Sequence, residues 1–463
     1  MRTLGSGSAC GIRVRGQSGW LAQAPRRDRQ AAALGRRPAT LTALLLLLIA
    51  APLAGQATTV LPPEVGMSGA ALDRLTRRLS QEVSEGRLPG GVLLVTREGD
   101  VVLEHAFGWR DLEADDLMRP DAIFRIASMS KLVTSVAALM LQEEGKLLLS
   151  DPVSKYIPEF TRTTVAVPRD GGGYDVVPTD RPITIRDLLT HTSGVGYGYG
   201  VARDRWEAAG ITGWYFAGRD EPIAGTVARM AALPFDAQPG TQFVYGYSTD
   251  ILGVVIERAS GQPLDAFLRE RIFLPLRMPD TSFFLAPSKR DRLATVYGID
   301  ESGKLVRAPD ASTNLGQGDY VEGPRKSFSG GAGLLSTARD YSRFMQMLLQ
   351  GGSLDGVRIL SPKSVQLMTV NHIGNLYPWE DGVGFGLGVF VVTDLGERGV
   401  LGSVGEFGWN GAYHTAAWAD PQERLVVVYL TQVIPATGLD DFRLVRAGVY
   451  GAITDAYGPT PRP

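Results

Sequence analysis

The alternation of apolar and polar residues predicts a helix followed by a β-hairpin at the start of the folded region. After Ser68, which can cap a helix, apolar residues recur at helical spacing as far as Val83. Gly90–Gly91 is expected to end this segment. Strand-like runs follow at 92–96 and 101–107, joined by a short polar turn. A hairpin of this kind belongs in a sheet with one face against helices.

The middle of the chain is predicted to be mainly helical. The segment from Ser128 to Gly145 carries an apolar face of Val, Ala, Met and Leu residues and is expected to be central to the fold. Residues 161–180, which include three consecutive glycines, indicate a loop. From 184 to about 283 helical patterns and loops follow without strand alternation, and we interpret this stretch as a helical insertion.

Strand patterns return in the C-terminal part of the chain. A helix is predicted at 337–349, strands at 386–393, 412–418 and 425–431, and a last helix at about 440–457. Since strands occur near both ends and helices lie between them, the pattern predicts an α+β fold. One antiparallel sheet would be built from both chain ends and flanked by helices.

The first 57 residues have the composition of a leader. An apolar run at 41–51 follows Arg36–Arg37 and precedes small residues at 54–57, which is the order found in a secretory signal. An uncleaved amino-terminal anchor is the alternative, although the run is short for a membrane span. We therefore expect a leader at 1–57 and a hydrolase domain at 58–463. The protein would be secreted or periplasmic, and attached to a membrane only if the leader is retained.

Charge and composition argue against several classes of function. The 463 residues have a net charge of −2, but the leader holds eight Arg and one Asp, so the remainder carries −9. An acidic remainder argues against nucleic acid as a partner. The four histidines are scattered, and the single cysteine, Cys10, lies in the leader. No metal, cofactor, disulfide or thiol nucleophile is expected.

The candidate nucleophile is a serine one helical turn before a lysine. The chain lacks the Gly-x-Ser-x-Gly pattern of Ser-His-Asp hydrolases. Ser128 and Lys131 instead lie three residues apart at the start of the predicted central helix, so their side chains share a face. A serine hydroxyl needs a neighbouring base, and the helix amino terminus would favour an oxyanion. The alternative is that Ser128 only caps the helix and Lys131 is a solvated surface residue.

Four stretches together resemble the serine β-lactamase and penicillin-binding protein superfamily, in particular its class C and esterase branch. They are the runs 124–139, 185–194 and 330–338, and the Trp-Asn-Gly sequence at 409–411. They occur in the family's order and span about residues 66–457. The resemblance implies a β-lactamase-like fold, with Ser128 as the acylated nucleophile and Lys131 as its proton-transfer partner.

The resemblance also implies a tyrosine that shares proton transfer with Lys131. In the stretch 243–253, the family's spacing to Asp-x-Leu-Gly assigns this role to Tyr245. Tyr247 is the rival for the role. It stands where the family has an Asn that orients substrate, and is therefore a candidate substrate-binding residue. Alternatively, both tyrosines are aromatic residues at the edge of the core.

The family's Lys-Thr-Gly strand matches Trp409-Asn410-Gly411 here, which we expect to contact substrate. The resemblance implies Ala412 as the second oxyanion-hole donor beside Ser128. Losing the lysine removes a charged partner worth about 1.5–3 kcal/mol to a substrate carboxylate, so neutral esters are favoured over penicillin-type acids. His414 is expected to follow on the same strand face as Ala412. It is either a substrate contact or a hydrogen-bonded sheet histidine.

Three residues of the 185–200 region are less informative. His191 is expected to fix a loop, whereas Tyr197 and Tyr199 could form an apolar rim to the site or a mobile surface loop. The sequence as a whole predicts a secreted serine hydrolase, with a carboxylesterase for small neutral esters favoured and a small-molecule ester or amide as partner. A β-lactamase or D-amino-acid peptidase is the alternative enzyme. A catalytically inactive protein that binds a peptide or glycan is the alternative from another class.

Overall fold

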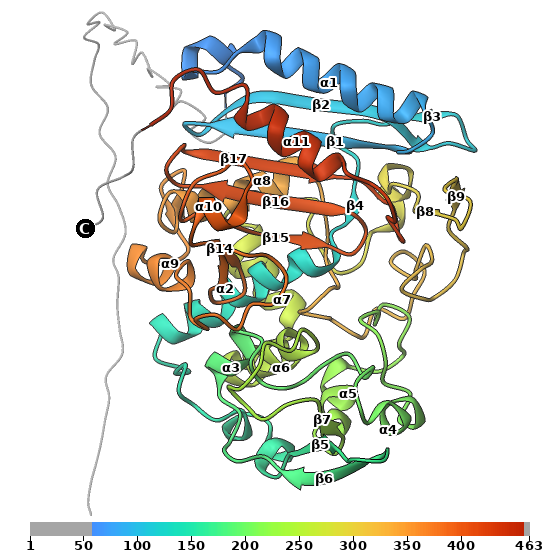
Figure 1. Ribbon diagram of the computed structural model, residues 1–463, viewed down its shortest axis with the longest axis vertical. Coiled ribbons are helices and arrows are strands. Elements are labelled where there is room, and N and C mark those ends of the chain that lie inside the picture. Colours follow the sequence, from blue (N-terminus) through green and yellow to red (C-terminus); the bar gives the residue numbers. More distant parts are fainter. Residues whose placement is uncertain (1–57, 458–463) are drawn as a thin grey trace, which may run out of the picture. The chain divides into compact units, whose positions relative to one another are not determined.

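The computed structural model describes residues 58–457, so the predicted leader at 1–57 lies outside the described residues. Within them, the largest sheet has eight antiparallel strands in the order β13-β14-β15-β16-β17-β1-β2-β3 (Figure 1). Its strands are β1 (Gly90–Arg97), β2 (Asp100–Asp111), β3 (Asp116–Leu117), β13 (Val383–Phe385), β14 (Phe390–Val392), β15 (Phe407–Gly411), β16 (Thr415–Asp420) and β17 (Leu425–Leu430). The predicted antiparallel sheet with strands from both chain ends is confirmed.

The two parts of the sheet join where β1 pairs with β17. The register runs from Val92 opposite Leu430 to Arg97 opposite Leu425. Alternate residues of β17 belong to two hydrophobic clusters, one on each face of the sheet. Because both faces are covered, β17 is a continuous apolar run instead of an alternating one.

Helices cover both faces of the sheet. On one face lie α1 (Gly69–Ser84) and α11 (Asp441–Tyr450), which pack against each other (Figure 1). On the other face α8 (Ala338–Leu349) packs against β16, β17 and β1. Ser68 caps α1 and Thr337 caps α8, each through a side-chain oxygen that accepts a backbone N–H three residues later. The predicted helices at both positions are confirmed.

The predicted central helix is α2 (Ser130–Glu143), and it begins with a tighter 3-10 turn, η2 (Ala127–Met129). Every side chain from Ser130 to Leu141 is buried. A helix that is buried all round belongs in the middle of a core, and α2 packs there against α6 (Ser248–Ser260). Because α2 is buried on all sides, the side chains of its first turn are held in fixed positions.

The mid-chain region is mainly helical, as predicted, but the segment before it, 161–180, differs from the prediction. Its helices are α3 (Ile185–Leu189), α4 (Arg203–Ala208), α5 (Ile223–Met230), α6, and α7 (Leu264–Leu268), which continues into a π-helical turn at Arg269–Phe273. The predicted loop at 161–180 is wrong. β5 (Thr164–Pro168) and β6 (Tyr174–Pro178) form a hairpin there, and β5 also pairs with β7 (Pro234–Phe235). The three glycines form only the turn, with positive φ, while β-branched residues beside them carry the strands.

Two further predicted strands, at 386–393 and 412–418, each include a turn that the prediction missed. Within 386–393, a turn separates β13 from β14, and Gly386 N–H donates to the Val389 carbonyl at 2.8 Å. Within 412–418, a turn separates β15 from β16; His414 has φ +62 and its N–H donates to the Gly411 carbonyl at 3.0 Å. The expectation that His414 and Ala412 share a strand face is therefore wrong.

Short elements complete the fold, and three predicted boundaries move. The additional elements are η1 (Pro62–Val65), β4 (Phe124–Arg125), η3 (Val153–Lys155), η4 (Pro158–Thr161), η6 (Pro287–Arg292), β8 (Tyr297–Ile299), β9 (Leu305–Arg307), β10 (Leu335–Ser336), β11 (Ser353–Leu354), β12 (Val357–Arg358), α9 (Pro362–Met368) and α10 (Leu395–Arg398). The first helix ends at Ser84, Gly90–Gly91 begins β1, and the last helix ends at Tyr450. Between residues 58 and 457, no helix has the length and apolarity to cross a membrane, and no cluster of metal-ligand residues occurs.

Candidate active site

The candidate nucleophile follows a strained turn at the start of α2. Ala127 has φ +42, in the left-handed region that residues with a side chain rarely adopt. Ser128 comes next and is 8% exposed. The preceding strand β4 pairs with β10, which ties this turn to the chain segment that follows Gly330. The turn therefore presents Ser128 beside the amino end of α2, where the helix dipole favours negative charge.

Lys131 is almost completely buried and points toward Ser128. Its side chain is 1% exposed. The amine Nζ lies 3.3 Å from Ser128 Oγ, 3.1 Å from the Tyr197 hydroxyl oxygen and 2.7 Å from the Gly331 carbonyl oxygen. The structure thus brings the two residues together on one helix face, as expected. Its three hydrogen-bond partners are all uncharged.

A buried carboxylate that the sequence analysis did not single out holds the loop against Lys131. Asp250, in α6, accepts hydrogen bonds from Ser329 Oγ at 2.5 Å and from Gly331 N–H at 3.1 Å. Burial raises the pKa of Asp250, and the charge of Lys131 opposes this increase. Asp250 therefore helps to aim the Gly331 carbonyl at the amine. Asp250 stands in the first turn of α6, before its apolar run, where acidic residues are common, so no sequence signal distinguished it.

Tyr245 reaches Lys131 through its ring and not through its hydroxyl. The Lys131 Nζ lies 4.6 Å from the centroid of the Tyr245 ring. The Tyr245 hydroxyl accepts a hydrogen bond from Trp409 Nε1 at 3.0 Å. His191 packs against the same ring, with centroids 4.7 Å apart. The structure therefore brings Tyr245, Lys131 and Trp409 together, with a geometry that the sequence did not indicate.

Tyr247 does not lie at the site. It is fully buried, and its hydroxyl donates to the Gly213 carbonyl at 2.6 Å while its ring stacks on Trp206. Burial raises the pKa of this phenol well above its ordinary value. The expectation that Tyr247 contacts substrate, or competes with Tyr245, disagrees with this position. The reason is local, since Tyr247 is the residue that enters α6 and its ring turns into the core.

The end of β15 approaches the nucleophile turn closely. A Cβ on Gly411 would lie 2.4 Å from the Ile126 carbonyl oxygen, so only glycine fits this position. Trp409 is 6% exposed, whereas Asn410 faces solvent. Among the described residues, the N–H of Ala412 donates to no acceptor. An N–H left free at this place is available to a substrate oxygen.

Ser128 opens into a cavity of about 660 Å³. Its walls are Ser128, Tyr245, Tyr377, Trp379, Glu380, Phe390, Arg398, Val400, Trp409, Asn410, Gly411, Ala412, Ala416, Trp418, Phe442, Arg443 and Arg446. The rings of Tyr245, Trp379 and Trp409 contact one another. Of the three arginines, Arg398 and Arg446 pair with the buried Glu406. The cavity can therefore hold a substrate with considerable apolar surface.

The other residues singled out in the sequence lie in different places, and only some of them are near Ser128. Burial lowers the pKa of His191 well below its ordinary value, so this histidine is neutral, and it packs on Tyr245 as a loop-fixing residue would. His414 hydrogen bonds with Asp441 at 2.7 Å and is not part of the cavity wall. Tyr199 is exposed. Tyr197, for which the sequence left open a rim to the site or a mobile surface loop, lies against the Lys131 amine.

Known proteins are similar to this chain in both sequence and fold. The family model described as Beta-lactamase matches residues 72–449. Protein Rv1367c of Mycobacterium tuberculosis is 36% identical over 383 residues, which cover 80% of this chain and 92% of that protein. Esterase EstB of Burkholderia gladioli is 31% identical over 371 residues, covering 77% and 89%. The solved structure titled "EstCE1, a hydrolase with promiscuous acyltransferase activity" is 29% identical, with a TM-score of 0.70 over 82% of this chain and 99% of that one.

Proposed function

Because the chain belongs to the β-lactamase family and is a serine hydrolase, we propose that it is a secreted carboxylesterase for neutral esters. Ser128 forms the acyl-enzyme, and Lys131 and Tyr245 transfer protons. One observation carries the proposal: the buried Lys131 amine lies 3.3 Å from Ser128 Oγ and has only uncharged hydrogen-bond partners. Such a pair provides a nucleophile with its own base.

The proposed reaction has two halves. In acylation, Lys131 takes the Ser128 proton while Oγ attacks the ester carbonyl carbon. The backbone N–H groups of Ser128 and Ala412 then donate to the new oxyanion, and the amino end of α2 adds a favourable field. Tyr245 gives a proton to the leaving alcohol. Water attacks the acyl-enzyme by the reverse route and restores Ser128.

Neutral esters fit this cavity better than carboxylated β-lactams. Trp409 stands at the position that a lysine has in β-lactamases, and its indole N–H is already used on Tyr245. The aromatic walls around it favour apolar groups, and the volume of about 660 Å³ exceeds what a small ester needs. The proposal therefore extends from small esters to those with a bulky apolar acyl or alcohol group. The similarity to proteins named esterases supports this preference.

Acyl transfer to an alcohol is a second candidate activity of the same acyl-enzyme. The aromatic cavity can hold an apolar alcohol in the place of the attacking water. The name of the similar EstCE1 includes acyltransferase activity, which supports this candidate. Adding a primary alcohol to the ester assay should then divert part of the acyl group into a new ester, measured by product chromatography.

The experiment that tests the hydrolase proposal combines labelling with turnover. A fluorophosphonate probe should label the wild type, Ser128→Ala should not be labelled, and Ser130→Ala should keep labelling because its hydroxyl accepts the Leu334 N–H and does not react. Lys131→Met, which fits a buried position, should lower kcat/KM for p-nitrophenyl esters by about 10²–10⁴-fold. Equal rates for Lys131→Met and wild type would refute the role of the lysine. Absence of labelling in the wild type would favour the inactive binding protein.

Two further points of the proposal have separate tests. Rapid turnover of a chromogenic cephalosporin would revive the β-lactamase alternative. Secretion rests on the leader-like composition of residues 1–57. Sequencing the amino terminus of the exported protein would identify the cleavage site, and an intact leader in the membrane fraction would contradict secretion.

A further inference from the structure

Two phenols surround the Lys131 amine, and only one of them contacts it through oxygen. The Tyr197 hydroxyl oxygen lies 3.1 Å from Nζ. Tyr245, to which the sequence assigned the proton transfer, places the face of its ring over the amine at 4.6 Å. Its hydroxyl meets Trp409 Nε1 instead. A proton that passes between Lys131 and Tyr245 therefore needs an intermediate oxygen.

Tyr197 is held firmly in the place of this intermediate. Its backbone carbonyl accepts the Gly213 N–H at 3.1 Å. Its ring packs edge-on against Tyr245 on one side, with centroids 5.8 Å apart, and against Tyr247 on the other, at 5.0 Å. Its hydroxyl contacts the Lys131 amine while its ring contacts the Tyr245 ring. Tyr197 thus bridges the two groups without lining the substrate cavity.

The Tyr197 phenol stays protonated and can both donate and accept. Burial raises the pKa of Tyr197 well above its ordinary value, and the neighbouring Tyr245 adds to the increase. A neutral phenol has one O–H donor and free lone pairs on the same oxygen. It can accept a proton from one neighbour while it gives its own to another. This property distinguishes Tyr197 from a purely apolar packing residue.

The hydrogen bonds of the Lys131 amine also determine where its lone pair points. An uncharged Lys131 has two N–H groups and one lone pair, and the Gly331 carbonyl at 2.7 Å can only accept. If the second N–H is directed at Tyr197, the lone pair faces Ser128 Oγ at 3.3 Å. Tyr197 as an acceptor therefore orients the amine as a base for the serine. Its own proton is then available for transfer to another acceptor.

We propose that Tyr197 is a positioning residue that relays the proton between Lys131 and Tyr245; this inference rests on the proposed function. In acylation the Ser128 proton moves to Lys131 as Oγ bonds to the carbonyl carbon and the bond to the leaving oxygen breaks. Tyr245 gives its proton to that oxygen. In the same step Tyr197 gives its proton to Tyr245 and takes one from Lys131, so that Tyr245 is not left as a phenolate. Both phenols and the amine end neutral, and the serine proton has reached the alcohol.

Leaving-group dependence tests the relay, because only a basic leaving group needs the relayed proton. The variant is Tyr197→Phe, which keeps the ring. Tyr199→Phe is the matched control, since it removes an exposed phenol from the same loop. For one acyl group, kcat/KM is measured for the p-nitrophenyl ester and for the ethyl ester, because this parameter reports acylation. We expect Tyr197→Phe to reduce it by about threefold for the first and about 10²-fold for the second.

Two results would overturn the relay. One is an equal loss on both esters, which would mean that Tyr197 only supports the shape of the site. The other is no loss on either ester. Tyr199→Phe should match the wild type on both. Failure of the proposed function is distinguishable, because it would appear as an unlabelled Ser128 in the wild type. Failure of the relay leaves labelling and wild-type turnover intact.

Discussion

At the scale of single residues, two tyrosines close in sequence have different roles because their surroundings differ. Tyr245 and Tyr247 are separated by one glycine, yet the first borders the cavity and the second is sealed in the core. The hydroxyl of Tyr247 is committed to the Gly213 carbonyl, whereas that of Tyr245 faces Trp409 at the cavity wall. A buried phenol with such a partner contributes to stability and cannot reach a substrate.

This contrast gives a prediction for Tyr247→Phe. Removing the hydroxyl leaves the buried Gly213 carbonyl without its partner, so the free energy of unfolding should fall by about 1–3 kcal/mol. Because the ring stays in place, kcat/KM should remain within about twofold of the wild type. Urea unfolding and an ester assay measure the two quantities. A large loss of activity at unchanged stability would restore Tyr247 as a functional residue.

At the scale of elements, long periodic segments could be predicted and turns within apolar runs could not. α1, α2, α8 and the β1–β2 hairpin carry caps or regular apolar spacing, which the sequence displays directly. The turn at 412–414 contains Ala, Tyr and His in place of Gly or Asn, so nothing local separates β15 from β16. The Ser128–Lys131 spacing follows from helix geometry. The contacts of Tyr197 and Asp250 depend on tertiary packing and could not be predicted.

The amino end of α8 allows a prediction on pH. Asp340, in its first turn, accepts hydrogen bonds from Asp280 N–H and Thr281 Oγ1 at 2.7 and 3.0 Å. Burial raises the pKa of Asp340 to about 6. As the pH rises from about 4 to 6, the unfolded chain ionises this carboxyl first, and the folded state loses stability relative to it.

The matched variant is Asp340→Asn, which cannot ionise. Between pH 4 and pH 7 the unfolding free energy of the wild type should fall by about 2 kcal/mol relative to the variant. Chemical denaturation of both proteins at each pH measures the difference, in which the titrations that do not depend on the Asp340 charge cancel. A difference that stays constant with pH would contradict the raised pKa.

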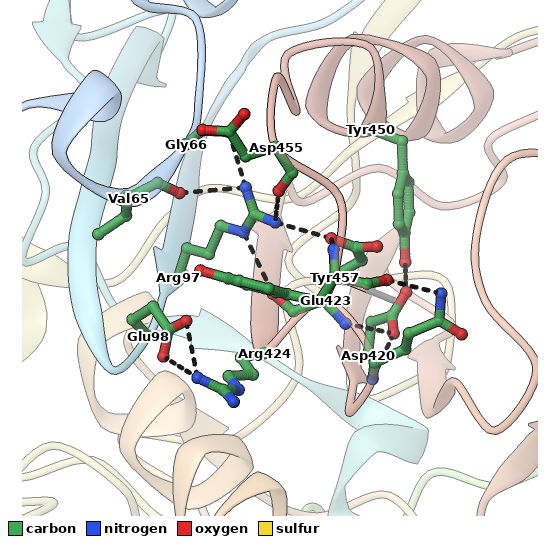
Figure 2. A network of polar contacts seen from close by, with 11 residues as sticks. Val65, Gly66, Arg97, Glu98, Asp420, Glu423, Arg424, Tyr450, Asp455 and Tyr457 are labelled. Carbon is green, nitrogen blue, oxygen red and sulfur yellow. Dashed lines mark hydrogen bonds and ion pairs between the residues drawn. The ribbon is translucent and has the colours of Figure 1, made fainter. Parts of the chain in front are cut away.

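At the scale of the whole molecule, one buried arginine connects the first and last segments of the described chain. Arg97, at the end of β1, donates to the carbonyls of Val65 and Gly66, at 3.0 and 2.7 Å, and to that of Asp455 at 2.7 Å (Figure 2). It also pairs with the Glu423 carboxylate at 2.7 Å. Polar contacts at the end of the central strand β1 thus hold the two chain ends together, in addition to the pairing of β1 with β17.

The last prediction separates this fastening from catalysis. Arg97→Met removes the donor to the buried Glu423 carboxylate and to four carbonyls, those of Val65, Gly66, Glu423 and Asp455, so the free energy of unfolding should fall by about 3–5 kcal/mol. Arg424→Met is the control: its exposed pair with Glu98 lies beside the same network, and its loss should leave the unfolding midpoint unchanged (Figure 2). Since neither arginine borders the cavity, both variants should keep wild-type kcat/KM well below their melting temperatures. Equal destabilisation by the two would mean that the β1–β17 register, and not Arg97, holds the chain ends together.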